Sequence, residues 1–205
     1  MSAKFQNKFR IDSTRLQNWD YSSNGKYFIT ICTCEMEHFF GKVADENMFL
    51  NEIGELADRY WHEIPNHFPY VHLDKFIVMP NHIHGILVID DPYNGGKRKD
   101  NRDSINAVCT DNDQLYTKKD SKCIGRDGMN AVCESKNPMQ SNNISKIIRW
   151  YKGRVTFHAH KINPKFEWHT RFYDHIIKDQ KALQRIRNYI KYNPKNWKED
   201  KYFEW

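Results

Sequence analysis

The sequence predicts an α+β fold: a ferredoxin-like sandwich, in which an antiparallel sheet carries helices on one face, plus an extra C-terminal helix. Two observations support this prediction. Stretches rich in β-branched and aromatic residues alternate with stretches of helical periodicity, in the order strand, helix, strand, strand, helix, strand, helix. Only Pro80 and Asn81 separate the two middle strands, which is enough for a hairpin and too short for a crossover. Such a fold is common and does not by itself indicate a function.

The first half of the chain supplies three strands and one helix. Strands are predicted at residues 27–34 (YFITICTC), 71–79 (VHLDKFIVM) and 82–89 (HIHGILVI), because β-branched and aromatic residues dominate them. The helix is predicted at residues 50–62, where apolar residues recur at three- and four-residue steps, and Pro65 follows its end. The long apolar runs of the second and third strands indicate central, buried positions.

The second half supplies two helices and a strand. A helix is predicted over residues 145–161, with Ser145 as its N-cap. Residues 166–177 include a strand-like start. The last helix is predicted over residues 180–192 and ends at Asn193, because a residue that precedes proline disfavours the helical region.

The chain is predicted to form a single domain over residues 1–205. Residues 1–25 form a basic, polar arm that either follows a phosphate backbone or is a solvated tail. Residues 91–143 are dense in Asp, Asn, Lys, Ser and Gly, and they contain a short internal echo, RDSINAVC at 102–109 and RDGMNAVC at 126–133. Two copies are too few for a solenoid. The segment is therefore predicted to be a flexible surface insertion.

Charge and composition restrict the partners and the compartment. Lysine and arginine outnumber aspartate and glutamate by 32 to 26, and the net charge of +6 favours a polyanionic partner. No apolar run approaches the roughly 18 residues of a membrane span, and no secretory signal is visible. The five cysteines include no CxxC pair, so we expect free thiols in a reducing cytoplasm.

A pair of histidines on the third predicted strand is the sharpest local signal. In the segment that begins at Asn81, residues two apart on a strand point to the same face, so His82 and His84 project together and Ile83 points to the core. Two adjacent imidazoles can bind a metal ion. An exposed histidine beside a hydrogen-bonded one gives the same pattern. Gly85 leaves room for a close approach of backbone or ligand.

A second signal lies in the last predicted helix. Tyr189 and Asn193 are four residues apart and therefore share one helix face. The side-chain carbonyl oxygen of Asn193 suits a hard cation. Tyr189 is either a phenol available for chemistry or a core aromatic at ordinary amphipathic spacing.

Three blocks of sequence, taken in order, resemble the HUH single-strand nucleases, in particular the single-tyrosine transposases and their REP-associated relatives. The blocks are VMPNHIHGI at 78–86, WHTRFYDH at 168–175 and YIKYNP at 189–194. The resemblance covers roughly residues 27–197 without the insertion. It implies a catalytic domain whose last helix carries the nucleophile.

The resemblance also implies a role for each motif residue. His82, His84 and Asn193 would bind a divalent metal, Mg²⁺ or Mn²⁺, and Tyr189 would be the catalytic nucleophile that forms a 5′-phosphotyrosine link. His175 would support the site or face the DNA. The implied substrate is single-stranded DNA, commonly with a hairpin, that is nicked and rejoined in DNA transposition. The protein would then associate with the nucleoid, as a monomer or a homodimer.

Basic residues of the helix predicted at 145–161 are candidate DNA contacts. These are Arg149, Lys152 and Arg154, although a solvated helix face gives the same pattern. Three other functions remain open. A non-catalytic module that binds single-stranded nucleic acid would need neither the histidine pair nor Tyr189. A domesticated nicking enzyme would serve the host, and a metal-dependent hydrolase would act without a covalent step.

Overall fold

A four-stranded sheet forms the centre of the computed structural model, which describes residues 4–5, 8–9, 21, 23–92 and 143–203. Its strands lie in the order β6-β7-β3-β8, and each neighbouring pair is antiparallel. Their bounds are Gly25–Cys32 for β3, Val71–Val78 for β6, His82–Ile89 for β7 and Tyr173–Ile177 for β8. This order is that of a ferredoxin-like sandwich, so the predicted fold class is confirmed.

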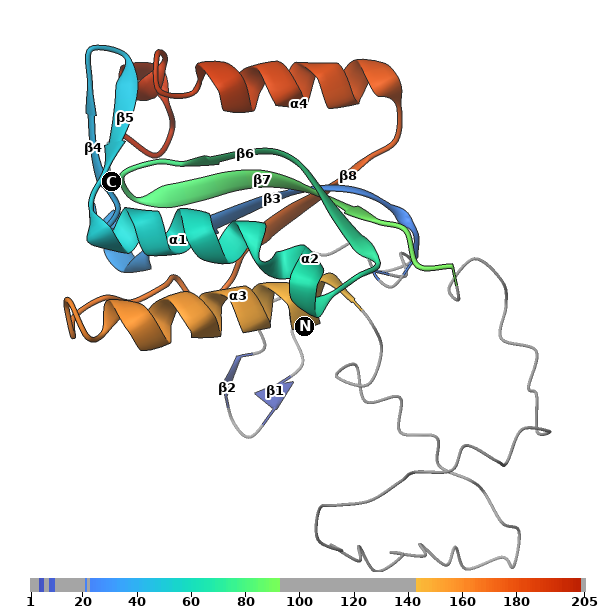
Figure 1. Ribbon diagram of the computed structural model, residues 1–205, viewed down its shortest axis with the longest axis horizontal. Coiled ribbons are helices and arrows are strands. Elements are labelled where there is room, and N and C mark those ends of the chain that lie inside the picture. The colour runs from blue at the N-terminus through green and yellow to red at the C-terminus, as the bar shows by residue number, and fades with distance from the viewer. Residues whose placement is uncertain (1–3, 6–7, 10–20, 22, 93–142, 204–205) are drawn as a thin grey trace, which may run out of the picture.

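Helices cover both faces of the sheet (Figure 1). Helices α1 (Glu52–His62) and α3 (Ile144–Ala159) pack beside each other on one face, and the short α2 (Ile64–His67) follows α1. Helix α4 (Gln180–Tyr192) lies on the opposite face and is the predicted extra helix. Among the described residues, no helix is long and apolar enough to cross a membrane.

The alternation of side chains along β3 supplies two separate cores. Tyr27, Ile29 and Ile31 are fully buried in the larger core, on the side of α1 and α3. Phe28 lies between them in sequence and packs against the smaller core, which holds α4. The buried members of that smaller core are Ile86, Ile177, Leu183 and Ile190. The helix expected to carry the nucleophile therefore rests on a few apolar side chains of the sheet.

Gly85 permits close contact between β7 and α1. A Cβ added at this position would lie 2.2 Å from Cζ2 of Trp61, which is fully buried. The indole of Trp61 also stacks on Phe76 of β6, with ring centroids 4.5 Å apart. The predicted room at Gly85 is therefore filled by an indole of the larger core, on the sheet face opposite to His82 and His84.

A second hairpin lies outside the predicted elements. Strand β4 (Gly41–Ala44) pairs with β5 (Asn47–Leu50) through Asp45 and Glu46, whose φ angles are 49° and 59°. Such turns usually contain glycine or asparagine at the positions of positive φ. Asp45 is compatible with such a turn, but Glu46 is unusual there and no glycine follows, so the sequence gives only a weak turn signal.

Several predicted boundaries differ from the structure, and two of the differences have a clear physical cause. Helix α3 is capped by Asn143, whose side chain accepts a backbone N–H of the first turn, and not by Ser145. The strand within residues 166–177 lies at the end of that range, because Trp168 near its start makes only an isolated bridge to Thr33. A strand-like composition is also typical of aromatic side chains that fill a core from a loop.

The remaining elements are short. Strand β1 (Lys4–Phe5) pairs with β2 (Lys8–Phe9) in the predicted arm, and the 3-10 helices are η1 (Cys34–Met36) and η2 (Trp197–Glu199). Most of the arm, and residues 93–142 of the insertion, lie outside the described residues. The predicted division into one domain, an arm and an insertion therefore stays a prediction.

Candidate active site

Strand β7 places His82 and His84 side by side on the sheet face that α4 covers. Both side chains are buried, with exposed fractions of 0% and 1%, and their ring centroids are 4.5 Å apart. Ile83 between them is fully buried in the larger core on the other face. The pair therefore projects as the strand period predicts, and neither histidine is the exposed residue that the alternative interpretation requires.

Asn81, which precedes the pair, determines which ring nitrogen of His82 carries the proton. Asn81 donates from Nδ2 to the carbonyl of Tyr202 at 2.8 Å, so its Oδ1 faces Nδ1 of His82 at 2.8 Å as an acceptor. His82 consequently carries its proton on Nδ1 and has a lone pair on Nε2. That Nε2 is buried and has no hydrogen-bond partner among the described residues. Burial lowers the pKa of His82 to about 3, which keeps the ring neutral.

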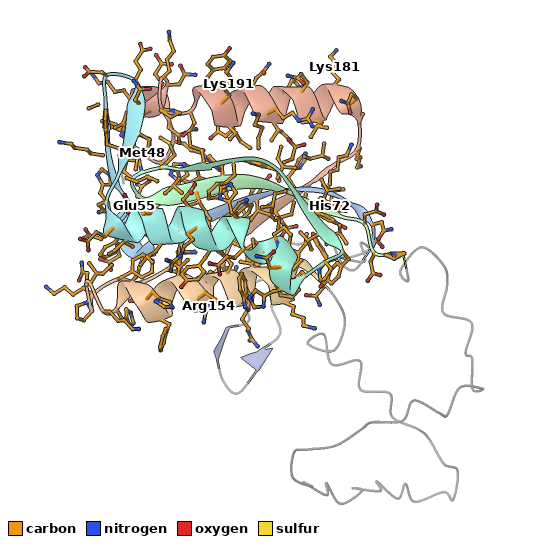
Figure 2. The ribbon with its side chains drawn as sticks, in the orientation of Figure 1. Met48, Glu55, His72, Arg154, Lys181 and Lys191 are labelled. Atoms are coloured by element: carbon orange, nitrogen blue, oxygen red, sulfur yellow. The ribbon has the colours of Figure 1, made fainter. Side chains whose placement is uncertain are left out.

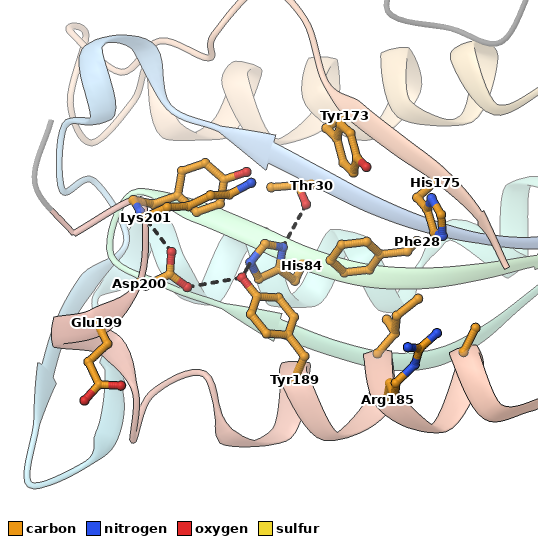
Figure 3. Close-up of a pocket in the computed structure, with 13 residues that line it drawn as sticks. Phe28, Thr30, His84, Tyr173, His175, Arg185, Tyr189, Glu199, Asp200 and Lys201 are labelled. Atoms are coloured by element: carbon orange, nitrogen blue, oxygen red, sulfur yellow. Dashed lines mark hydrogen bonds between the residues drawn. The ribbon is translucent and has the colours of Figure 1, made fainter.

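His84 connects the sheet to the nucleophile predicted on α4. Its Nδ1 lies 2.9 Å from Oγ1 of Thr30 on β3, and its Nε2 lies 3.1 Å from the phenol oxygen of Tyr189 (Figure 3). Burial lowers the pKa of His84 well below its usual range, and the nearby His82 acts in the same direction. Both imidazoles are thus neutral near pH 7, the form in which histidine binds metals.

Tyr189 reaches the histidines from the last turns of α4. Its side chain is 42% exposed, and its phenol donates to Oδ2 of Asp200 at 3.2 Å. Burial of the phenol and the adjacent carboxylate of Asp200 raise the pKa of Tyr189. The phenol therefore needs a proton acceptor or a cation before it can attack a phosphate.

Asn193 and Asp200 complete the cluster. Nδ2 of Asn193 donates to Oδ2 of Asp200 at 2.8 Å, while Oδ1 of Asn193 is buried without a partner among the described residues. The ligand atoms of His82, His84 and Asp200 lie within 4.8 Å of one another. Sequence reasoning misses Asp200, because η2 folds the C-terminal segment back onto the site and no spacing indicates that contact. The segment after Pro194 holds three lysines and three acidic residues, so its composition does not single out Asp200.

These side chains fit a divalent cation. Nε2 of His82 and Oδ1 of Asn193 are buried polar atoms without partners in the described part of the chain, and such atoms are costly unless a ligand satisfies them. Asp200 supplies a negative charge within reach of both imidazoles. Neutral nitrogens with amide and carboxylate oxygens form a mixed donor set that suits Mg²⁺, Mn²⁺ or a later transition metal. The cluster of His82, His84 and Asp200, with Asn193 beside it, is a candidate metal site.

The other predicted residues lie at two different places. A cavity of about 520 Å³ lies next to Tyr189, and His175 on β8 borders it, paired across the strands with Phe28. Arg149, Lys152 and Arg154 lie on α3, on the sheet face opposite to α4, and Arg154 is visible there in Figure 2. The structure thus places His175 on the cavity beside the candidate metal site and leaves the three basic residues on the far face. Their predicted contact with DNA stays a prediction.

Comparison with a solved structure identifies the class of fold. No family model matches the chain. The structure of the REP-associated tyrosine transposase bound to a REP hairpin has a TM-score of 0.52 over 91% of this chain and 74% of that chain, at 15% identity. This chain therefore has the fold of that transposase.

Comparison of sequences identifies the family. An uncharacterized protein of Haemophilus influenzae is 35% identical over 192 residues, which cover 93% of this chain and 92% of that protein. At this identity and coverage, the chain belongs to the same family as the Haemophilus influenzae protein.

Proposed function

We propose that the protein is a metal-dependent endonuclease of the transposase type, which nicks and rejoins single-stranded DNA through a 5′-phosphotyrosine intermediate. The observation that carries this proposal is the position of the Tyr189 phenol, 3.1 Å from Nε2 of His84 and beside buried metal-type donors. An aromatic residue that only fills the core would be buried, whereas Tyr189 is 42% exposed.

The residues of this chain would divide the reaction between them. Oη of Tyr189 attacks phosphorus and forms a new bond, while the bond from phosphorus to the 3′ oxygen breaks. Asp200 already accepts the hydrogen bond of the phenol, so it is placed to take the proton as the attack proceeds. The departing 3′ oxygen takes up a proton from solvent. The phosphotyrosine bond preserves the energy of the phosphodiester, so a 3′ hydroxyl can later reverse the reaction without ATP.

The metal would be held by His82, His84 and Asn193, and Asp200 is a further ligand within reach. A divalent cation in this site supplies charge neutralisation and orientation of the phosphate oxygens. We propose Mg²⁺ or Mn²⁺, with Mn²⁺ better suited to two imidazole ligands.

The proposed substrate is single-stranded DNA that carries a hairpin. The solved transposase of the same fold is bound to a REP hairpin. The net charge of +6 of this chain favours a polyanion, and the cavity beside Tyr189 is bordered by aromatic and basic side chains that suit unpaired nucleotides.

A covalent-adduct assay tests this function. Labelled oligonucleotides with hairpins from the DNA beside the gene are incubated with protein and Mn²⁺ or Mg²⁺, then resolved on a denaturing gel. We expect an adduct that requires metal, disappears in Tyr189→Phe and persists in Tyr192→Phe. Tyr192 is a matched control, because it is 46% exposed one turn further along α4 and does not border the cavity.

Other outcomes would favour the alternative functions. Metal-dependent cleavage that survives Tyr189→Phe would indicate a hydrolase without a covalent step. Tight binding with no cleavage in either metal would indicate a binding module and would contradict the proposal.

A further inference from the structure

A cavity of about 520 Å³ lies between α4 and the sheet, directly beside Tyr189 (Figure 3). His84 and Asp200 border one end of it, so the cavity is continuous with the candidate metal site. The proposed chemistry uses only that end. The remainder extends along β3 and β8 to His175, and the reaction as described gives it no role.

Aromatic side chains border this second part of the cavity. Phe28 lies between His84 and His175 in Figure 3, and its ring centroid is 5.2 Å from that of His84. Tyr173 of β8 borders the same space and is 51% exposed. Open aromatic surface of this kind stacks unpaired bases without regard to sequence.

Two cations stand at the rim of the cavity. Arg185 reaches it from α4, and Lys201 reaches it from the C-terminal segment, with Nζ 5.9 Å from the ring centroid of Tyr173. An aromatic slot with cations at its edges is complementary to a nucleotide, whose base is flat and apolar and whose phosphates are charged.

The position of Phe28 indicates which nucleotide would enter. Its ring meets that of Tyr189 edge-on, with centroids 6.1 Å apart. A base stacked on Phe28 is therefore adjacent to the attacking phenol, and it belongs to a nucleotide joined to the scissile phosphate rather than to one further along the strand.

We propose that this cavity binds the unpaired base of a nucleotide that flanks the phosphate attacked by Tyr189. Phe28 is the stacking surface, His175 contacts the edge of the base at the far end, and Arg185 contacts a neighbouring phosphate. A base enclosed between the sheet and α4 cannot remain paired, so the cavity also selects single strands over duplexes. This inference rests on the proposed function for the identity of the scissile phosphate.

A double-mutant cycle between protein and DNA tests the proposal. Dissociation constants are measured by fluorescence anisotropy in the Tyr189→Phe background, for a hairpin oligonucleotide and for copies with one abasic site at each single-stranded nucleotide. We expect one flanking abasic site to weaken binding by about tenfold, which is within the usual effect of losing one stacked base. The same site should weaken binding less than twofold once Phe28→Leu is added.

The choice of variants protects the test against misfolding. Phe28→Leu keeps an apolar side chain against the smaller core, and His175→Ala removes an exposed side chain with the same expected loss of coupling. His72→Ala is the matched control, because it removes an exposed imidazole from the other edge strand, away from the cavity.

The outcomes separate this proposal from the proposed function. Equal abasic penalties in the parent protein, Phe28→Leu and His175→Ala at every position would overturn the base site, whatever the adduct assay shows. Coupling at one position without any adduct from the wild-type protein would support the base site and contradict the nuclease.

Discussion

Gly85 restricts the packing of the larger core. Its missing Cβ is the space that the buried indole of Trp61 occupies, so replacement forces one of the two elements to move. We expect Gly85→Ala to lower the free energy of unfolding by about 1–3 kcal/mol, the usual cost of overpacking. Urea unfolding measures this change.

Gly153 of α3 provides the matched control. A Cβ at Gly153 meets nothing within 4 Å, so Gly153→Ala should stabilise the protein by about 0.5–1 kcal/mol through helix propensity. Equal effects of the two alanines would show that β7 and α1 do not pack through Gly85.

The buried histidines make the metal-free protein sensitive to acid. The pKa of His82 is lowered to about 3 by burial, whereas an unfolded histidine titrates near 6.5. The unfolded chain therefore binds more protons between these values, and stability should fall as the pH falls from about 6.5 towards 3. Between pH 6.5 and pH 5 we expect a loss of about 1–2 kcal/mol from His82 alone.

Urea unfolding in the presence of a chelator, at both pH values, measures this dependence. The variant His82→Gln should show a weaker dependence on pH than the wild-type protein. Parallel pH profiles for the two proteins would mean that His82 is not held neutral in the folded state.

At the residue scale, the sequence predicts those features of the site that depend on the period of a single strand or helix. The common direction of His82 and His84 follows from the strand period, and the shared face of Tyr189 and Asn193 follows from the helix period. Asp200 depends on how the C-terminal segment returns to the sheet, and no local period reports a tertiary contact of that kind.

Helix α4 must be held at a fixed distance and orientation relative to the sheet for Tyr189 to reach His84. The guanidinium of Arg187 binds both carboxylate oxygens of Asp74, with Nε to Oδ1 at 3.0 Å and Nη2 to Oδ2 at 2.6 Å. Asp74 lies where the register of β6 shifts between Leu73 and Phe76. Two bonds from one planar group fix orientation as well as distance.

We therefore expect Asp74→Asn and Arg187→Met each to slow adduct formation on the order of tenfold, because small displacements of a nucleophile have large effects on rate. Single-turnover rates on the hairpin oligonucleotide measure this. Glu46→Gln is the control, since it breaks an ion pair to Lys195 that is about 60% exposed on both sides. Unchanged rates in Asp74→Asn and Arg187→Met would show that the apolar contacts alone position α4.

Elements with a strong periodic pattern are predicted well, and elements that depend on unusual turns or on distant contacts are not. Strands β6 and β7 and helix α4 agree with the predicted ranges to within one residue. The hairpin of β4 and β5 is not predicted, because Asp45 and Glu46 adopt positive φ in a turn that contains no glycine. The start of β8 is misplaced, since Trp168 fills the core from a loop.

At the scale of the whole molecule, the two faces of the sheet have different roles. The face under α1 and α3 holds the larger core, and the face under α4 holds the candidate metal site and the cavity (Figure 1). The pairing of β6 with β7 is predictable, because the short link of residues 79–81 forces a hairpin. The edge position of β6 is not predicted, because its long apolar run indicates a central strand. The side on which α4 lies is not predictable from its own periodicity, which says only that one helix face is apolar.

The central claim is that Tyr189 becomes covalently joined to DNA in a metal-dependent reaction. The most direct measurement is mass spectrometry of the adduct after protease and nuclease digestion, with and without chelator. We predict a nucleotide phosphate on the peptide that contains Tyr189, assigned by fragmentation to that residue and absent when the metal is removed. Modification of Tyr173 or Tyr192 instead, or an adduct that forms equally with chelator, would contradict the account.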